Sequence, residues 1–166
     1  MHIDSALRLT RRLTLAVTTI ALVSACASIQ KPLSVADTIA KTPELSTRHG
    51  LVKAAGLTET LQGPGPFTVF APNDAAFKAL KAGTLDDLGK HPEKLKDLLT
   101  YHVVPGALAA KDVKNSTVKA VNGDPLALSK AGDFVTVENA MVTKGDVMAS
   151  NGVIHIIDTV MTPPKK

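Results

Sequence analysis

Residues 149–164 read ASNGVIHIIDTVMTPP and contain the segment that decides the fold. Within it, residues 153–157 (VIHII) are β-branched at four of five positions and apolar at both phases of a two-residue period. A strand with two apolar faces lies between covering layers. The Asn151-Gly152 pair accepts positive φ and predicts a tight turn before the strand, and Pro163-Pro164 cannot continue a ladder and marks its end. We therefore expect a central strand late in the chain, paired with the earlier segment Phe67–Ala71 (FTVFA).

The chain has 166 residues, enough for one domain with an apolar core. Hydrophobic residues make up 45% of it and aromatic residues only 3%, so aliphatic side chains must form most of the core. So few rings disfavour a surface that stacks on sugars or nucleic-acid bases. We expect core positions for all five rings, which are Phe67, Phe70, Phe77, Tyr101 and Phe134.

The formal net charge of +4 overstates the basic character of the domain. Three Arg and one Asp precede Cys26, so 16 of the 19 basic residues and 14 of the 15 acidic residues remain from Cys26 onward. Only Arg48 among these 16 is an arginine, and the lysines are scattered. Because a nucleic-acid surface needs clustered Arg and Lys, we expect no nucleic-acid partner.

The first 26 residues have the organisation of an export signal. Three arginines precede an apolar run at residues 13–22, which is shorter than the roughly 20 residues that span a bilayer. Residues 23–26 (VSAC) resemble a bacterial lipobox, and Cys26 is the only cysteine. That resemblance implies lipidation of Cys26 and anchoring to the cell envelope, at the periplasmic or outer cell surface. The alternative is a plain secretory signal cut after Ala27, which gives a secreted soluble protein.

Residues 27–33 are expected to form a short tether to a single domain over residues 34–164. Apolar spacing and capping residues predict helices in the first half, at residues 34–41, 44–55, 57–61, 73–83, 84–88 and 92–100. Alternating patterns between turn signals predict strands after them, at residues 101–104, 117–121, 126–129, 134–137 and 141–143. Helices followed by strands indicate the α+β class.

Three stretches in this order resemble the signatures of the fasciclin domain family. Residues 67–77 (FTVFAPNDAAF) look like the first signature, residues 149–163 like the second, and residues 101–106 (YHVVPG) like the tyrosine–histidine segment between them. The likeness covers about residues 33–163 as a single copy. It implies a wedge-shaped antiparallel β-sandwich with several helices packed along it. Residues 48–50 (RHG) depart from the apolar and Ala residues usual at these positions. The resemblance therefore leaves the packing of the helix predicted at residues 44–55 open.

The same resemblance implies a non-catalytic adhesion or interaction module, secreted or bound at a surface. Most signature residues have a structural interpretation as strand, cap, turn or loop tie, namely Phe67, Phe70, Pro72, Asn73, Asp74, Phe77, Asn151, Gly152, His155 and Asp158. In related eukaryotic domains, the tyrosine–histidine segment and an Asp followed by Ile are linked to integrin contact. The counterparts here, Tyr101, His102, Asp146 and Val147, are candidate interaction residues. For Tyr101 and His102, the alternative is a buried hydrogen-bonded pair.

The sequence predicts no enzyme, metal site or cofactor. Strand alternation places His155 and Asp158 on opposite faces, and no glycine-flanked nucleophile accompanies them. The histidines at 49, 91, 102 and 155 lack the spacing of metal ligands. Two functions remain open. One is a surface-tethered module that binds an unknown protein or cell-surface partner, and the other is an envelope carrier of a lipid or small apolar ligand in a cleft between helices and sheet.

Overall fold

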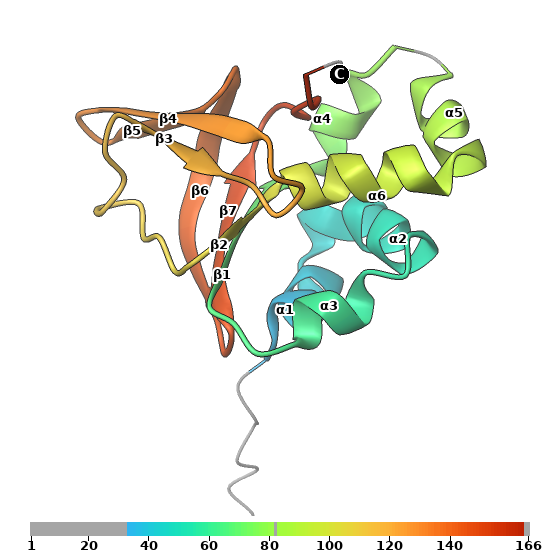
Figure 1. Ribbon diagram of the computed structural model, residues 1–166, viewed down its shortest axis with the longest axis horizontal. Coiled ribbons are helices and arrows are strands. Elements are labelled where there is room, and N and C mark those ends of the chain that lie inside the picture. Colours follow the sequence, from blue (N-terminus) through green and yellow to red (C-terminus); the bar gives the residue numbers. More distant parts are fainter. Residues whose placement is uncertain (1–32, 82, 165–166) are drawn as a thin grey trace, which may run out of the picture.

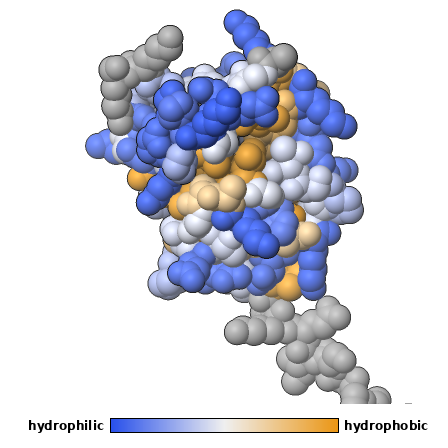
Figure 2. Space-filling view, turned by 90° about the vertical axis from the view of Figure 1, so that its right-hand side faces the viewer, coloured by the Kyte–Doolittle hydropathy of each residue, from blue (hydrophilic) through white to orange (hydrophobic). Residues whose placement is uncertain are grey.

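The computed structural model describes residues 33–81 and 83–164 and places a layer of short helices against a strongly curved sheet (Figure 1). The predicted export signal, with Cys26, and nearly all of the predicted tether lie outside the described residues. Within them, no helix has the length and apolar character needed to cross a membrane. The helical side of the surface is mostly hydrophilic, with apolar residues visible between the helices (Figure 2).

The helices fill most of the first half of the domain, as predicted. They are α1 (Val35–Lys41), η1 (Pro43–Leu45), α2 (Ser46–Ala54), α3 (Thr58–Gln62), α4 (Asp74–Lys78), α5 (Thr84–Lys90) and α6 (Pro92–Tyr101). Ser34 caps α1 by accepting the N–H of Asp37 at 3.2 Å, and Asn73 caps α4. Two boundaries were predicted wrongly. The α4 helix ends at Lys78 rather than near Gly83, and Tyr101 is the last residue of α6 rather than the first of a strand.

Seven strands form the sheet in the order β2-β1-β7-β6-β5-β4-β3. Their bounds are β1 (Phe67–Pro72), β2 (Val103–Pro105), β3 (Ser116–Lys119), β4 (Pro125–Ala131), β5 (Phe134–Val137), β6 (Ala140–Ala149) and β7 (Gly152–Ile157). The predicted pairing of β7 with β1 is confirmed and is parallel, from Phe67 opposite Gly152 to Pro72 opposite Ile157. The other pairs are antiparallel, and the α+β fold class is confirmed.

The turn that precedes β7 differs from the prediction in its backbone. Neither Asn151 nor Gly152 has positive φ. Gly152 is required for another reason, because a Cβ at this position would overlap the backbone carbonyl of Phe67 in the neighbouring strand. Strand β7 also ends at Ile157, well before the two prolines, because the chain bends at Asp158.

Strand β6 is much longer than predicted, and residues 144–148 belong to it rather than to a loop. Its pairing with β7 shifts register between Val142 and Lys144 and again between Lys144 and Val147. Asp146 has φ +54° at this irregularity. A β-bulge of this kind keeps a strand continuous while it admits residues that disfavour regular pairing, such as Gly145.

Alternate side chains of β1 and β7 enter two separate cores, as a strand with two apolar faces requires. Val69 and Ile154 belong to the helix-side core, which we define as the cluster between these strands and the helices. Phe70 and Ile157 belong to the barrel-side core, enclosed by β2 to β7. The core position predicted for Phe134 is wrong, since its side chain is 66% exposed.

Candidate functional site

The signature residues around β7 fasten distant segments together. The side-chain oxygen of Asn151 accepts the N–H of Val35 at 2.8 Å, and its amide nitrogen donates to the carbonyls of Leu61 and Gly63, each at 2.9 Å. The carboxylate of Asp158 accepts the N–H of Met141 at 2.9 Å, as the sequence predicted for a residue that ties a loop. Asn151 therefore ties the helical layer to the sheet, and Asp158 ties the end of β7 to the start of β6.

The Asn73-Asp74 pair anchors the helical layer to the end of β1. Asn73 accepts the N–H of Ala76 at 2.8 Å, which confirms its role as a cap. Asp74 reaches the start of α2 and accepts hydrogen bonds from the Ser46 hydroxyl at 2.6 Å and the Thr47 N–H at 2.8 Å. Burial alone would raise the pKa of Asp74, but these hydrogen bonds outweigh it and hold the pKa below its ordinary value.

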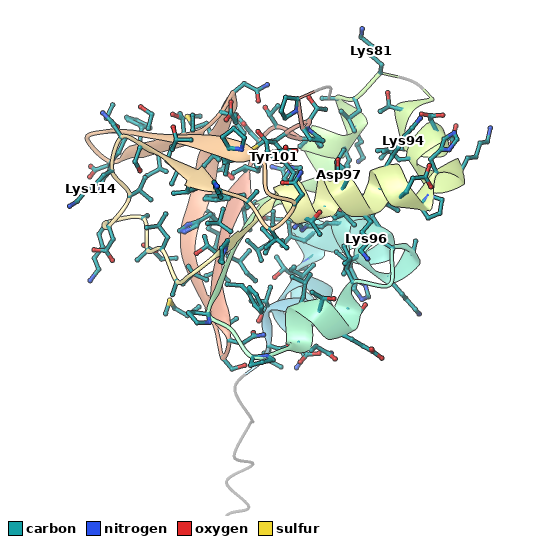
Figure 3. The ribbon with its side chains drawn as sticks, viewed as in Figure 1. Lys81, Lys94, Lys96, Asp97, Tyr101 and Lys114 are labelled. Atoms are coloured by element: carbon teal, nitrogen blue, oxygen red, sulfur yellow. The ribbon has the colours of Figure 1, made fainter. Side chains whose placement is uncertain are left out.

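Tyr101 and His102 are both buried. Figure 3 shows Tyr101 where α6 meets the sheet. The Tyr101 hydroxyl donates to the carbonyl of Pro125 at 3.2 Å. Nε2 of His102 accepts the N–H of Met161 at 3.1 Å, so Nδ1 carries the proton and donates to the carbonyl of Leu98 at 2.7 Å. Their burial favours the alternative of a hydrogen-bonded interior pair, and we remove both residues from the candidate contact surface.

Burial also sets the charge state of this pair. The pKa of His102 falls to about 3, first because the ring is desolvated and second because the positive charge of Arg48 is near. The pKa of Tyr101 rises, chiefly through burial and also through the carboxylates of Glu138 and Asp124. Both side chains are therefore neutral at pH 7 and act as hydrogen-bonding core residues.

His155 is engaged in the same manner on the barrel side. Its Nδ1 accepts the N–H of Asp146 at 3.3 Å, so Nε2 donates to the carbonyl of Leu108 at 2.7 Å. Its ring stacks on Phe70 with a centroid distance of 5.5 Å. The contact links the bulge of β6 to the segment before β3 and leaves neither ring nitrogen facing solvent.

Asp146 and Val147 are the two candidate interaction residues that reach the surface. Asp146 is exposed, and its carboxylate accepts the N–H of Ala110 at 2.8 Å. Val147 is half-buried and packs against the helix-side core. The structure therefore separates this pair from Tyr101 and His102, which point into the interior.

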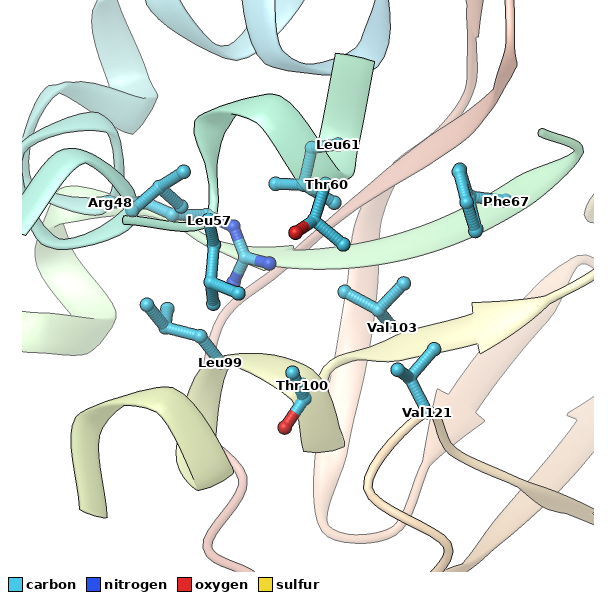
Figure 4. A pocket seen from close by; sticks show the side chains of 10 residues that line it. Arg48, Leu57, Thr60, Leu61, Phe67, Leu99, Thr100, Val103 and Val121 are labelled. Atoms are coloured by element: carbon cyan, nitrogen blue, oxygen red, sulfur yellow. The ribbon is translucent and has the colours of Figure 1, made fainter. Parts of the chain in front are cut away.

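The sequence did not single out a pocket that lies between α2, α3, α6 and the start of β1. Its walls are mostly aliphatic, and Arg48 of α2 extends its guanidinium into the space between them (Figure 4). The side chain of Arg48 is fully buried, and its three guanidinium nitrogens have no hydrogen-bond partner among the described residues. The ten lining residues are Arg48, Val52, Leu57, Thr60, Leu61, Phe67, Leu99, Thr100, Val103 and Val121.

Charged groups elsewhere are dispersed. Lys81, Lys94 and Lys96 lie on the helical layer, and Lys114 lies at the opposite end of the molecule (Figure 3). Within residues 33–81 and 83–164, no three His, Cys, Asp or Glu side chains are grouped so that they could hold a metal ion.

Comparison with known proteins identifies the family to which this chain belongs. A family model described as the fasciclin domain matches residues 43–163. The chain belongs to the fasciclin domain family. As a fasciclin domain it is 43% identical over 140 residues to Protein sll1483 of Synechocystis sp., a match that covers 83% of this chain and 78% of that protein.

Two further fasciclin relatives carry more descriptive names. The cell surface glycolipoprotein MPB83 of Mycobacterium bovis is 36% identical over 135 residues, which are 78% of this chain and 60% of the relative. The solved domain pair of the insect cell adhesion molecule Fasciclin I superposes with a TM-score of 0.64 at 18% identity, over 81% of this chain and 51% of that one. At 18% identity, the likeness to the Fasciclin I domain pair shows the fold alone.

The buried arginine is the feature of this fasciclin domain that sequence reasoning missed. A signal was present, because Leu45, Arg48 and Val52 are spaced to share one helical face. The first and last are buried core residues, so this spacing was a signal, not used in the prediction, that Arg48 lies in the interior.

Proposed function

We propose that this fasciclin domain is a non-catalytic adhesion or interaction module held at the cell surface. The observation that carries the proposal is its membership of a family that includes a cell adhesion molecule and a cell surface glycolipoprotein. The chemistry of the interior supports it, because both ring nitrogens of His102 and of His155 are occupied by backbone groups. Such histidines have no free nitrogen for proton transfer.

The exposed face of β5 and β6 is the best candidate contact surface. Phe134 and Thr136 point to the same side of β5, and Thr136 lies opposite Met141 of β6. Phe134 is 66% exposed and Met141 is 41% exposed, so two large apolar side chains stand in water on one sheet face. We define Phe134, Thr136 and Met141 as the outer sheet face. Exposed aromatic and Met side chains are typical anchors of protein interfaces.

A lipid anchor at Cys26 would orient this face. Leu33 is held beside the β6–β7 turn, since its carbonyl accepts the N–H of Ser150 at 2.8 Å. The seven residue-to-residue steps from Cys26 to Leu33 span at most about 25 Å. The β6–β7 turn would then lie near the membrane, whereas β4 and β5 lie on the side of the sheet away from the helices (Figure 1). Many anchored copies would add weak contacts through effective concentration.

Lipidation is tested by replacing the thiol. In cells of the source organism we expect Cys26→Ser to release the protein from membranes and to abolish labelling by a radioactive or alkynyl fatty acid. Fractionation and label incorporation measure both effects. Acyl labelling that survives the substitution would exclude Cys26 as the site.

The contact surface is tested with beads coated with the domain and mixed with cells of the source organism, with a host extract or with further coated beads. We expect retention or bead clustering, lowered about tenfold or more in the double variant Phe134→Ser, Met141→Ser, because anchor residues contribute about 2 kcal/mol each. Met148→Ser is the matched control, since Met148 is 70% exposed on another part of β6. Absence of binding in every arm contradicts the adhesion proposal, and equal loss in the control contradicts the assigned surface.

The carrier function considered above has one specific observation in its favour, the pocket at Arg48.

A further inference from the structure

The guanidinium of Arg48 is a buried group whose hydrogen-bonding needs are unmet. Five N–H donors of an arginine normally find acceptors, and nearly all buried polar side chains do. Here Nε, Nη1 and Nη2 all lack a partner among the described residues. The ion pairs of that part of the chain lie at the exposed junction of α5 and α6, and none includes Arg48.

The group is also charged. Burial lowers the pKa of Arg48 to about 9, which is still above neutrality, so the guanidinium carries its proton at pH 7. His102 is near enough to feel this charge but offers no negative charge in return, since burial and the charge of Arg48 lower its pKa to about 3 and keep the ring neutral. A lone positive charge in an apolar interior is costly unless an anion joins it.

The pocket wall specifies what kind of anion. Around the guanidinium the lining is aliphatic, from Leu57, which precedes α3, Leu61 of α3, Leu99 of α6 and Val103 of β2 (Figure 4). The cavity measures about 30 Å³, and all the empty space between its walls, with the open solvent at the mouth included, measures about 370 Å³. Thr60 and Val121 are exposed at the mouth and can change rotamer to widen it.

We propose that this pocket binds an aliphatic monocarboxylate. The carboxylate accepts paired hydrogen bonds from the planar guanidinium of Arg48, a geometry that suits the two groups. The alkyl chain lies against the leucine and valine side chains and leads toward the mouth. One positive charge matches a single negative charge, whereas a phosphate dianion would leave an excess charge in the apolar pocket. The inference stands independently of the adhesion proposal.

The test compares ligands that differ in one property. Unfolding of the lipid-free domain is followed with octanoate, acetate, octanol and chloride at equal concentrations. We expect octanoate to raise Tm most and with dose, acetate and chloride to raise it less, and octanol to leave it nearly unchanged. Titration calorimetry then gives the Kd of octanoate. No measurable octanoate binding, or chloride as effective as octanoate, would overturn the proposal.

The variant Arg48→Met separates binding from structural support. Met preserves an apolar stem of similar length and removes the unpaired charge, so we expect the free variant to have a higher Tm than the free wild type. We also expect its Kd for octanoate to be weaker by about tenfold or more, because a charge-assisted pair is lost. Lys53→Met, which removes an exposed charge from the same helix, should change neither property.

Two results would reject the role of Arg48. One is an Arg48→Met variant that is less stable than the wild type without ligand, and the other is octanoate affinity that survives the substitution. The outer sheet face provides an independent readout, since the variant Phe134→Ser, Met141→Ser should bind octanoate with unchanged Kd. Failure of octanoate binding and failure of bead adhesion are therefore distinguishable.

Discussion

The barrel-side core and the helix-side core share the strands β1 and β7, but the polar side chains inside them differ in their hydrogen bonding. On the barrel side, Tyr101 and His155 enter the interior, and each meets a backbone partner at 3.3 Å or less. On the helix side, Arg48 enters the interior and meets none among the described residues. The satisfied groups specify a unique packing of the sheet. The unsatisfied guanidinium is where we propose that a ligand carboxylate binds.

The wall between the two cores is where a substitution should have its largest effect. A Cβ at Gly152 would overlap the Phe67 carbonyl, and backbone atoms cannot move aside as side chains do. We expect Gly152→Ala to disrupt the β1–β7 pairing and to lower the free energy of unfolding by more than about 4 kcal/mol, enough to impair folding. Yield of folded protein and chemical denaturation measure this.

Gly50→Ala is the matched control for that substitution. Gly50 lies inside α2, and a Cβ there would meet nothing within 4 Å. We expect the change to stabilise the protein by about 1 kcal/mol, since Ala is the better helix former. If both substitutions changed the free energy of unfolding by a small amount in the same direction, the close approach of β1 and β7 would not restrict the residue at position 152.

Tyr101 tests whether the barrel-side core depends on its polar anchors. The ring is 3% exposed, so Tyr101→Ala should cost about 3 kcal/mol through lost packing. Tyr101→Phe keeps the ring and removes the hydrogen bond to Pro125, and it should cost only about 1 kcal/mol. Thermal and urea unfolding distinguish the two. If Tyr101→Ala left the midpoint unchanged, the ring would have to be exposed, and the surface role would be restored.

His102 makes the boundary between the cores sensitive to pH. Its pKa is about 3 in the folded protein and near 6.5 when unfolded, so below pH 6.5 the unfolded chain binds a proton that the folded protein excludes. Stability is therefore retained above pH 6.5 and lost as the pH falls from there toward 3. Between pH 7 and pH 5 this amounts to about 2 kcal/mol.

The variant His102→Gln isolates that contribution. It should be less stable than the wild type at pH 7 but should lose less stability between pH 7 and pH 5, as urea unfolding at both values would measure. An unchanged slope in His102→Gln would contradict the assignment of the acid sensitivity to this ring.

The sequence predicted those parts of the fold that depend on local pattern. The two apolar phases of residues 153–157 were sufficient to predict a central strand, and Asn73 and Asp158 were recognised because caps and loop ties use short-range geometry. The bulge at 144–148 was missed because a glycine and charged residues there resemble a loop. The alternation of buried and exposed residues along β5 places Phe134 on the outer side. The prediction gave more weight to its aromatic ring than to this alternation.

The candidate site was beyond that reasoning for a physical reason. Arginine is almost never fully buried, so its place on the apolar face of α2 was taken as an interruption. The pocket that surrounds it is completed by α6, β2 and the chain at Val121, which are distant in sequence. Tyr101 and His102 likewise bind carbonyls and N–H groups that only the folded chain brings near, such as those of Pro125 and Met161.

The place of β7 in the sheet has a consequence for biogenesis. Strand β7 is the last of the seven strands in the sequence, and its parallel partner β1 is the first. A chain that ends before Gly152 lacks β7, the strand that joins β1 to β6, so neither core can close. Long-range pairing of this kind is slow. We therefore expect the domain to remain unfolded until β7 is available to pair with β1 and β6.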